Sequence, residues 1–386
     1  MAYDKVVDSA SLDSKLTQVA DAIRTKGNTS ADLQFPSGFI SAIQAIQTGT
    51  ELKIVVSVAS GATVTATKGS KVVSGTSING MCTLTVPEAG TWSVKATLGG
   101  ETSNTKSVTF TDSYDVTLAF VLPTLNDNDW AKIREVSDKG DGANYWSVGD
   151  RKAVTLNGTV GHLTLSNYTT YAFIIGFNHN ADLEGSNRIH FQLAKTALSG
   201  GTDVCFCDDE YAPESEWSRP GAGYFVMNAS DTNSGGWKSS QMRTNICGTS
   251  LLSYSGTIIA VIPAALRAII KSVTKYTDNT ANGGGSTASY ITATTDYFFL
   301  LSEFEVFGSI SYGNTNEKNK QAQYAYYSTG NSKIKYKHNG TSTAALWWTR
   351  SPFANNPNAF VYVSAGGTVG GGSPYGSFGF APGFCV

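Results

Sequence analysis

Charged side chains are scarce in this chain of 386 residues: they make up only 15% of it, and its lysines and arginines form neither a run nor a stripe at helical spacing. The formal net charge is -2. A protein that binds nucleic acid needs concentrated positive charge to neutralise phosphates. The sequence therefore predicts no nucleic-acid partner.

Long apolar runs are also missing. No stretch approaches the roughly 20 apolar residues that cross a bilayer, and the polar start, Met1 to Ala10, does not resemble a secretion signal. We expect neither a signal peptide nor a membrane span.

Cysteines are few and odd in number, which argues against a disulfide framework. We expect mostly reduced, buried thiols at the five positions, which are Cys82, Cys205, Cys207, Cys247 and Cys385.

Glycine and large aromatic residues are plentiful, with 40 Gly, 18 Tyr, 18 Phe and 7 Trp. Such a composition is typical of short strands joined by turns around real cores. The length suggests two or three domains.

The first fifty residues contain two helical patterns. Apolar residues recur at helical spacing between Ser11 and Lys26 and again between Pro36 and Gln47. Two short helices bury little apolar surface by themselves, so we expect them to pack against a copy of themselves or against another protein.

Between Glu51 and Leu122 the pattern changes to period two, which predicts a small immunoglobulin-like sandwich acting as a spacer. The expected strands are Lys53 to Val58, Thr63 to Thr67, Cys82 to Val86, Thr91 to Thr97, Ser107 to Thr111 and Asp115 to Phe120. A third, more aromatic unit follows, with one clear helix expected from Pro263 to Val273.

The N-terminal segment resembles one that recurs in tail and baseplate proteins of phages from Gram-positive gut bacteria. The likeness rests on the helix Leu16 to Arg24, Gly27, Phe35-Pro36 and Phe39. This resemblance implies a role in attachment to the phage tail.

The last unit resembles an uncharacterised phage and gut-bacterial domain related to the C-type-lectin fold, in the variant of formylglycine-generating enzymes and retroelement-diversified phage adhesins. The matching blocks are Trp146 to Asp150, Gly235 to Arg243, Ile262 to Arg267, Phe299 to Gly308, Trp347 to Pro352 and Gly379 to Cys385. The expected fold class is therefore multidomain and mainly β, with an α+β C-terminal domain. Its parts are N-terminal helices (1–49), an immunoglobulin-like sandwich (50–122) and a C-type-lectin-like domain (123–386).

Near the C-terminus, scaffold and ligand-facing residues separate. Trp347 and Trp348 on one strand are expected to be structural, and Arg350 is expected to pin a loop through fork-like hydrogen bonds. Alternation along Phe360 to Ser364 predicts that one face of this strand points outward. In the diversified relatives, the segment that corresponds to the residues between Trp347–Pro352 and Gly379–Cys385 varies. One sequence does not reveal whether this gene is diversified.

We predict that this exposed strand face and two adjoining loops bind the ligand. The predicted residues are Phe353, Ala354, Asn355, Asn356, Asn358, Tyr362, Ser364, Ala365, Thr368, Gly370, Gly372, Ser373 and Tyr375.

Catalytic and metal-binding patterns are weak. Cys205 and Cys207 share one face of a strand, but no further cysteine or histidine completes a tetrahedral site. The histidines at positions 162, 179, 190 and 338 lack metal spacing, so we expect isolated histidines that are solvated or hydrogen-bonded. Asp208 to Glu210 and Asn126 to Asp129 suit turns and caps, although a structural calcium ion stays open. The run Gly283 to Gly285 is expected to be only a flexible loop. No cofactor is predicted.

The sequence thus predicts a non-enzymatic phage-tail adhesin in the virion, made in the bacterial host cytoplasm. It would bind a protein or glycan on a bacterial surface, contact other tail proteins through its N-terminal segment and form a homotrimer. Two alternatives are a structural tail or decoration protein and an enzyme on the formylglycine-generating fold.

Overall fold

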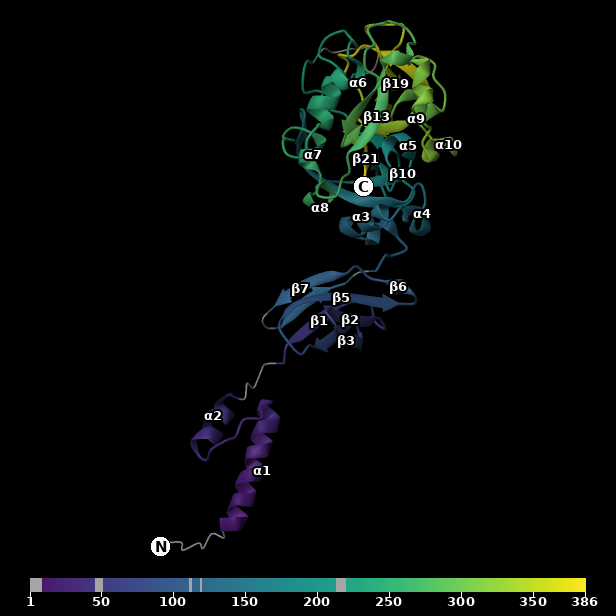
Figure 1. The fold of residues 1–386 in the computed structure, drawn as a ribbon. Helices are drawn as coiled ribbons and strands as arrows, with labels where there is room; N and C mark the ends of the chain where they lie inside the picture. Colours follow the sequence, from purple (N-terminus) through teal and green to yellow (C-terminus); the bar gives the residue numbers. More distant parts are fainter. Residues whose placement is uncertain (1–8, 46–50, 111–112, 119, 213–219) are drawn as a thin grey trace. The chain divides into compact units, whose positions relative to one another are not determined.

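The computed structural model describes residues 9–45, 51–110, 113–118, 120–212 and 220–386 (Figure 1). The chain divides into two compact units, Met1–Phe120 and Val121–Val386. It is mainly β, with several small sheets and a few helices, which confirms the predicted β-rich character. None of the helices in the described ranges combines the length and hydropathy that crossing a membrane requires.

Two helices open the first unit: α1 (Ser9–Gly27) and α2 (Ser37–Ala45). Both predicted helices are present, although residues 46 and 47 of the second lie outside the described residues. The two helices meet through a small cluster that includes Ala20, Ile23 and Phe39. Other apolar residues of the helices stay exposed, namely Leu12, Val19, Ile40 and Ile43.

The remainder of the first unit is built from two sheets. Their strands are β1 (Lys53–Ser57), β2 (Thr63–Lys68), β3 (Lys71–Thr76), β4 (Met81–Thr85), β5 (Gly90–Leu98), β6 (Glu101–Thr102), β7 (Lys106–Phe110) and β8 (Tyr114–Thr117). One sheet has the order β4-β1-β8, and the other has the order β3-β2-β5-β6 with β7 also paired to β5. Alternate residues of both sheets enter one core, which contains the fully buried Trp92. All six predicted strands are present, five of them within a residue or two; β8 ends at Thr117, three residues before the predicted end at Phe120. Residues 111 and 119 lie outside the described part.

The second unit holds short helices. They are η1 (Leu125–Asp127), α3 (Trp130–Asp138), α4 (Gly142–Tyr145), α5 (Ala181–Glu184), α6 (Gly236–Ser239), η2 (Met242–Cys247), α7 (Ile258–Val261), α8 (Ala264–Arg267), η3 (Ala288–Tyr290), α9 (Glu303–Phe307), η4 (Thr315–Asn319) and α10 (Ala325–Ser328). Its strands are β9 (Arg151–Val160), β10 (Leu163–Phe177), β11 (Ile189–Lys195), β12 (Val204–Cys205), β13 (Val273–Asp278), β14 (Ile291–Asp296), β15 (Phe298–Phe299), β16 (Lys335–Lys337), β17 (Gly340–Ala345), β18 (Trp347–Pro352), β19 (Phe360–Val363), β20 (Val369–Gly372) and β21 (Gly383–Cys385).

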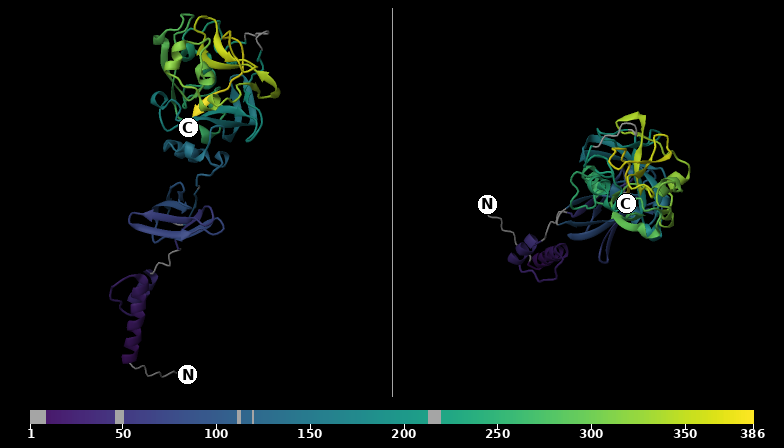
Figure 2. Two further views of the ribbon diagram at one scale, coloured as in Figure 1. Left: turned by 90° about the vertical axis from the view of Figure 1, so that its right-hand side faces the viewer. Right: turned by 90° about the horizontal axis from the view of Figure 1, so that it is seen from above.

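The largest sheet of this unit has the order β15-β21-β11-β10-β9. The last strand, β21, thus pairs between β15 and β11, and Figure 2 shows the yellow C-terminal segment running among the green and teal parts of the unit. One large apolar core extends from Leu125 to Val386. The C-terminal residues are therefore a central part of the scaffold.

The predicted helix from Pro263 to Val273 is wrong in extent. Helix α8 covers only Ala264–Arg267, and Val273 begins strand β13. The cause is tertiary: the Lys271 N–H donates to the Cys385 carbonyl oxygen at 2.9 Å instead of to a helical carbonyl. Pairing with the C-terminal strand ends the helix early.

Candidate functional site

The hairpin β19–β20 separates the predicted ligand-binding residues into two groups. Phe360 pairs with Gly372 at one end of the hairpin, and Val363 pairs with Val369 at the other. The loop 353–359 lies at the first end and the turn 364–368 at the second. Strands rise about 3.3 Å per residue, so the two groups are about 10 Å apart along the hairpin.

At the first end, a stretch that we name the asparagine loop is exposed to solvent. It consists of Asn355, Asn356, Pro357 and Asn358, all of which are exposed. The loop is ordered by its own polar groups, because the Asn358 N–H donates to Asn356 Oδ1 at 2.9 Å.

The asparagine loop is held from beneath by Asn233, a fully buried residue that no sequence pattern singled out. Asn233 Nδ2 donates toward the carbonyl oxygens of Phe353, Asn356 and Ala359 at 2.8 to 3.0 Å. The Asn233 N–H also donates to the Pro357 carbonyl oxygen at 2.7 Å. The two hydrogens of the Asn233 amide are shared among three backbone carbonyls, and its backbone N–H binds a fourth, so this one residue fixes the shape of the loop.

Two neighbouring segments flank the asparagine loop. Asp231 accepts hydrogen bonds from Ser373 Oγ at 2.6 Å and from Asn358 Nδ2 at 3.3 Å. On another side, the Gly285 N–H donates to the Ala354 carbonyl oxygen at 2.9 Å. Gly283 lies so close to Pro357 that a Cβ atom added to this glycine would be 2.8 Å from the proline ring. The glycine run, predicted to be only a flexible loop, packs closely against the asparagine loop.

The prediction of an exposed strand face is wrong. Both faces of β19 are covered, since all four of its residues are buried. The ring of Tyr362 packs against Trp348 and Phe378, with centroids 6.3 and 5.5 Å away, and a Cβ on Gly370 would come within 2.5 Å of it. This packing withdraws Tyr362 from solvent.

The remaining predicted residues differ in exposure. Besides Tyr362, four others are buried and so are corrected as solvent-facing residues: Ala354, Gly372, Ser373 and Tyr375. Ser364, Ala365 and Gly370 are half-buried, Thr368 is exposed, and the half-buried Phe353 packs on Tyr312 with ring centroids 4.8 Å apart. The predicted residues that are exposed are thus Asn355, Asn356, Asn358 and Thr368.

The strand before the asparagine loop is scaffold, as predicted. Trp347 and Trp348 are fully buried, and their indole N–H groups donate to the carbonyl oxygens of Lys333 and Phe225. Arg350, also fully buried, donates to Leu300 O at 2.9 Å and to both carboxylate oxygens of Glu305. These contacts confirm the fork-like role expected for this arginine.

Helix α9 links that scaffold to the loops. Ser302 and Glu305 form a capping box at its start. Glu303 accepts hydrogen bonds from the N–H groups of Tyr312 and Gly313, and the Tyr312 carbonyl accepts the Ala354 N–H at 2.9 Å. The Phe299 to Gly308 block therefore supports the chain that leads into the asparagine loop.

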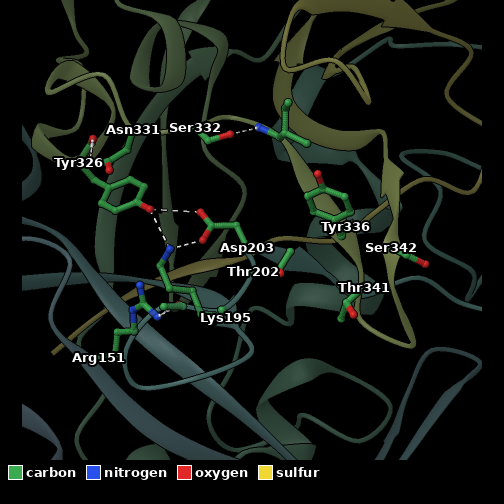
Figure 3. Close-up of a pocket in the computed structure, with 13 residues that line it drawn as sticks. Arg151, Lys195, Thr202, Asp203, Tyr326, Asn331, Ser332, Tyr336, Thr341 and Ser342 are labelled. Carbon is green, nitrogen blue, oxygen red and sulfur yellow. Dashed lines mark hydrogen bonds and ion pairs between the residues drawn. The ribbon is translucent and has the colours of Figure 1, made fainter.

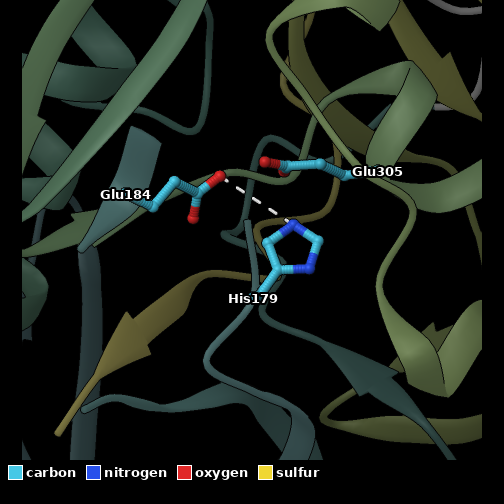
Figure 4. Close-up of side chains that lie close together, drawn as sticks. All are labelled: His179, Glu184 and Glu305. Atoms are coloured by element: carbon cyan, nitrogen blue, oxygen red, sulfur yellow. Dashed lines mark ion pairs between the residues drawn. The ribbon is translucent and has the colours of Figure 1, made fainter. Parts of the chain in front are cut away.

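A group of three buried side chains has metal-ligand chemistry. Ligand atoms of His179, Glu184 and Glu305 lie within 4.8 Å of one another and point toward a common space (Figure 4). Lys275 Nζ, however, lies 2.6 Å from Glu184 and 3.1 Å from Glu305, and Arg350 binds Glu305 as well. The two carboxylates already face two cations, which would repel a metal ion in this low-dielectric interior. The group is better described as a buried charge network.

Burial sets the protonation of this network. Burial and the Lys275 ammonium lower the pKa of His179 to about 3, so its ring is neutral near pH 7. Burial raises the pKa of Glu184. Burial alone would also raise the pKa of Glu305. The attraction of Arg350 and Lys275 outweighs this effect and holds the pKa of the carboxyl far below its usual range.

His190 and His338 take part in hydrogen bonds, as expected, but His179 and His190 are not isolated. His179 stacks on Tyr324 with ring centroids 3.7 Å apart, and its ring lies 5.5 Å from that of His190. His190 Nδ1 is 3.1 Å from Tyr324 Oη and 3.3 Å from Cys385 Sγ. Tertiary contacts between distant segments bring these rings together, which sequence spacing does not reveal.

The cysteines behave as predicted: all five are free and buried. Cys205 and Cys207 do share one face, with their sulfurs 4.0 Å apart. Beside His190, burial raises the pKa of Cys385 to about 12, so its sulfur is a thiol and a poor nucleophile near neutral pH.

The acidic runs form turns and caps. Asp129 caps helix α3 by accepting the Lys132 N–H at 2.6 Å. Asp208 accepts hydrogen bonds from the Phe225 N–H and Ser377 Oγ, both at 2.6 Å. The Glu210 N–H also donates to Asp208 Oδ1 at 3.2 Å, which closes a local turn, so the turn-forming role of Asp208 and the capping role of Asp129 are confirmed.

A polar cleft of about 740 Å³ lies near the second end of the hairpin (Figure 3). A Cβ on Gly367, in the turn 364–368, would lie 3.0 Å from Ile334, which lines this cleft. The second group of predicted residues therefore borders a concave surface that the sequence did not indicate.

Comparison with known families matches residues 224–386 to a family described as "Domain of unknown function (DUF6273)". This match covers the hairpin, the asparagine loop and the Lys275, Glu305 and Arg350 part of the charge network, whereas His179 and Glu184 precede it; it assigns no activity. Neither the curated proteins nor the solved structures contain a match to the chain.

Proposed function

We propose that this protein is a phage-tail adhesin that recognises a ligand on a bacterial surface through the asparagine loop. The observation that carries the proposal is the support of an exposed polar loop by the buried Asn233. A loop held in one conformation loses little entropy on binding. Its amide side chains offer both donors and acceptors to a protein or a glycan.

Recognition is favoured over catalysis by the placement of the ionisable groups. The charge network around Glu305 is buried and paired within itself. A glycosidase needs two carboxylates across a cleft, and Asp203 is the only carboxylate that lines the cleft of about 740 Å³ in the described part of the chain.

The remaining assignments rest on the sequence resemblances. In this proposal residues 1–49 attach the protein to the tail of a virion, the sheets of residues 50–122 form an immunoglobulin-like spacer, and residues 123–386 adopt a C-type-lectin-like fold. The exposed apolar side chains of α1 and α2 support attachment or self-association, since such a surface is normally covered by a partner.

Replacing Asn355 and Asn358 by alanine should lower cell binding. The labelled full-length chain is applied to a panel of Gram-positive gut bacteria, and binding is measured by flow cytometry. We expect the double variant to bind the recognised strain about tenfold more weakly, because the loss of one or two interfacial hydrogen bonds has that magnitude.

The matched control for this experiment is Asn339→Ala, which removes an exposed asparagine outside the asparagine loop. Its binding should equal that of the parent protein. Undiminished binding by the double variant would move the ligand site elsewhere, and a parent protein that binds no strain would favour a structural tail component.

Self-association should depend on the exposed apolar side chains of the two helices. Val19 is 48% exposed and Ile43 is 54% exposed. Placing glutamate at both positions should convert the proposed trimer into monomers of 40.8 kDa, because like charges buried in the interface oppose association. Light scattering after size-exclusion chromatography measures this mass. Leu252→Glu, at a position that is 96% exposed in the second unit, should leave the trimer intact; a parent protein that is already monomeric would contradict the proposal.

A further inference from the structure

The cleft of about 740 Å³ has more cations than anions around it. Its lining includes Arg151 and Lys195 but only one carboxylate, Asp203. Figure 3 shows the Lys195 ammonium between Asp203 and Tyr326, and it donates to the Tyr326 hydroxyl at 2.8 Å while pairing with Asp203. The Arg151 guanidinium donates through Nη1 to the carbonyl oxygens of Ala197 and Gly200 but pairs with no carboxylate in the described part of the chain, so its positive charge is in excess.

A third cation lies behind this lining. Lys335 is 1% exposed, and its Nζ has no hydrogen-bond partner among the described residues. The ammonium lies 5.4 Å from the centre of the Phe173 ring, which the Lys195 ammonium also faces at 4.5 Å. Burial lowers the pKa of Lys335 to about 8, although Asp203 opposes this shift. A buried ammonium without an anion of its own is costly in a folded protein.

The structural explanation of these lysines is incomplete. Cation–π contacts with Phe173 and with Trp347, 5.3 Å away, stabilise the Lys335 ammonium in part. These cation–π contacts do not neutralise the three positive charges, which have one carboxylate among them. The chain as a whole has a net charge of -2, so the excess of positive charge is local to this cleft. The excess therefore points to an anion supplied from outside.

The other groups of the cleft suit a saccharide. Two tyrosines, Tyr326 and Tyr336, belong to the lining, and Ser332, Thr341 and Ser342 add hydroxyl groups (Figure 3). The half-buried Tyr336 ring offers an apolar face to the C–H groups of a sugar, whereas the Tyr326 ring is buried against Phe173 and Tyr327. The hydroxyl groups exchange hydrogen bonds with the polar edge of the sugar.

We propose that this cleft is a second binding site, which takes an acidic saccharide whose carboxylate or phosphate approaches Arg151 and Lys195. Lys335 acts through space, because its field is weakly screened in the protein interior. This site is separate from the asparagine loop and does not depend on the function assigned to that loop.

The test is calorimetric titration of the full-length chain with four probes: glucuronate, glucose 1-phosphate, glucose and inorganic phosphate. We expect one of the two acidic sugars to bind at least about tenfold more tightly than glucose and than inorganic phosphate. Which acidic sugar binds distinguishes a carboxylate from a phosphate as the anionic group.

Two variants locate the binding. Lys335→Met, which removes an ammonium without a hydrogen-bond partner, should fold normally and bind the preferred sugar about tenfold more weakly, and Arg151→Gln should show a similar loss. The control is Lys337→Met on the same strand, since Lys337 packs over Tyr211 and does not line the cleft. It should retain full affinity.

Equal binding of glucose and the acidic sugars, or full affinity in both Lys335→Met and Arg151→Gln, would overturn the proposal. Binding of inorganic phosphate as tight as that of the sugars would overturn its saccharide part. The variant carrying alanine at 355 and 358 should bind the acidic sugar normally, so failure of one site is distinguishable from failure of the other.

Discussion

Replacing Arg350 by methionine is expected to destabilise the second unit by about 3–5 kcal/mol, the usual cost of breaking a buried ion pair. The side chains of Arg350 and Glu305 are both fully buried. Without the guanidinium, Glu305 keeps the Ser302 N–H as a donor and, among the described residues, Lys275 as its one cationic partner, which it shares with Glu184. The Leu300 carbonyl and the Thr277 hydroxyl would lose a donor as well.

Guanidinium chloride unfolding followed by tryptophan fluorescence measures this loss. Trp92 is the only tryptophan before residue 121, so the signal of the other six reports on the second unit. The control is Arg134→Met, because Arg134 is 33% exposed and its pair with Asp138 lies at the surface. That change should cost no more than about 1 kcal/mol. Equal unfolding midpoints for the two variants would mean that Lys275 alone neutralises Glu305.

Local patterns predicted the first unit well because its elements are governed by neighbouring residues. Period-two alternation marked strands such as β1 and β5, whose alternate residues enter the core. Helical spacing marked α1 in the same way. Where a helix or strand buries only one of its faces, the spacing of apolar residues in a single sequence is sufficient to predict it.

The exposure of the residues that we predicted to bind the ligand was anticipated only in part, since alternation assumes that a strand has one covered face. Strand β19 is covered on both faces. Tyr362 is therefore buried, although the alternation along the strand placed it among the residues expected to point outward. The asparagine loop was found correctly because its turn-forming residues have a local signature. The support of this loop by Asn233 was not predicted, because Asn233 and the loop carbonyls that it binds are 120 or more positions apart in the sequence.

The charge network was missed for a similar reason. His179, Lys275 and Glu305 come from three distant segments, and no spacing rule connects them. A signal did exist: Glu305 and Arg350 each stand within strongly apolar blocks, Phe299 to Gly308 and Trp347 to Pro352. Opposite charges in two such blocks suggest a buried pair, because each charge needs a partner where water is absent.

Glu317→Gln should make the second unit more stable than the parent at alkaline pH. Glu317 is fully buried, and it accepts hydrogen bonds from the Asp278 N–H at 3.0 Å and Ser351 Oγ at 2.7 Å. Burial raises the pKa of this carboxyl to about 7, from an ordinary value of 4.5. Between these two values the unfolded chain releases the proton while the folded protein keeps it, so the contribution of Glu317 to stability falls as pH rises.

Glutamine has no such proton, and its amide oxygen can accept the Asp278 N–H in the same place. The free energy of unfolding of Glu317→Gln, minus that of the parent, should therefore rise by about 3 kcal/mol between pH 4.5 and pH 8. Denaturant unfolding of both proteins across this range measures the difference. The titrations of His179 and Glu184, which both proteins share, cancel in it.

An opposite sign is expected for Glu135→Gln, which serves as the control. Partial burial raises the pKa of Glu135, but hydrogen bonds from Lys132 and Lys139 outweigh this effect and leave the pKa below its usual value. Glu135 therefore stabilises the fold above its ordinary pKa, and its loss should make the variant less stable relative to the parent as pH rises. Parallel pH curves for Glu317→Gln and the parent would show that the Glu317 carboxyl ionises in the folded state as readily as in the unfolded chain. Its environment would then have to admit enough water or positive charge to offset burial.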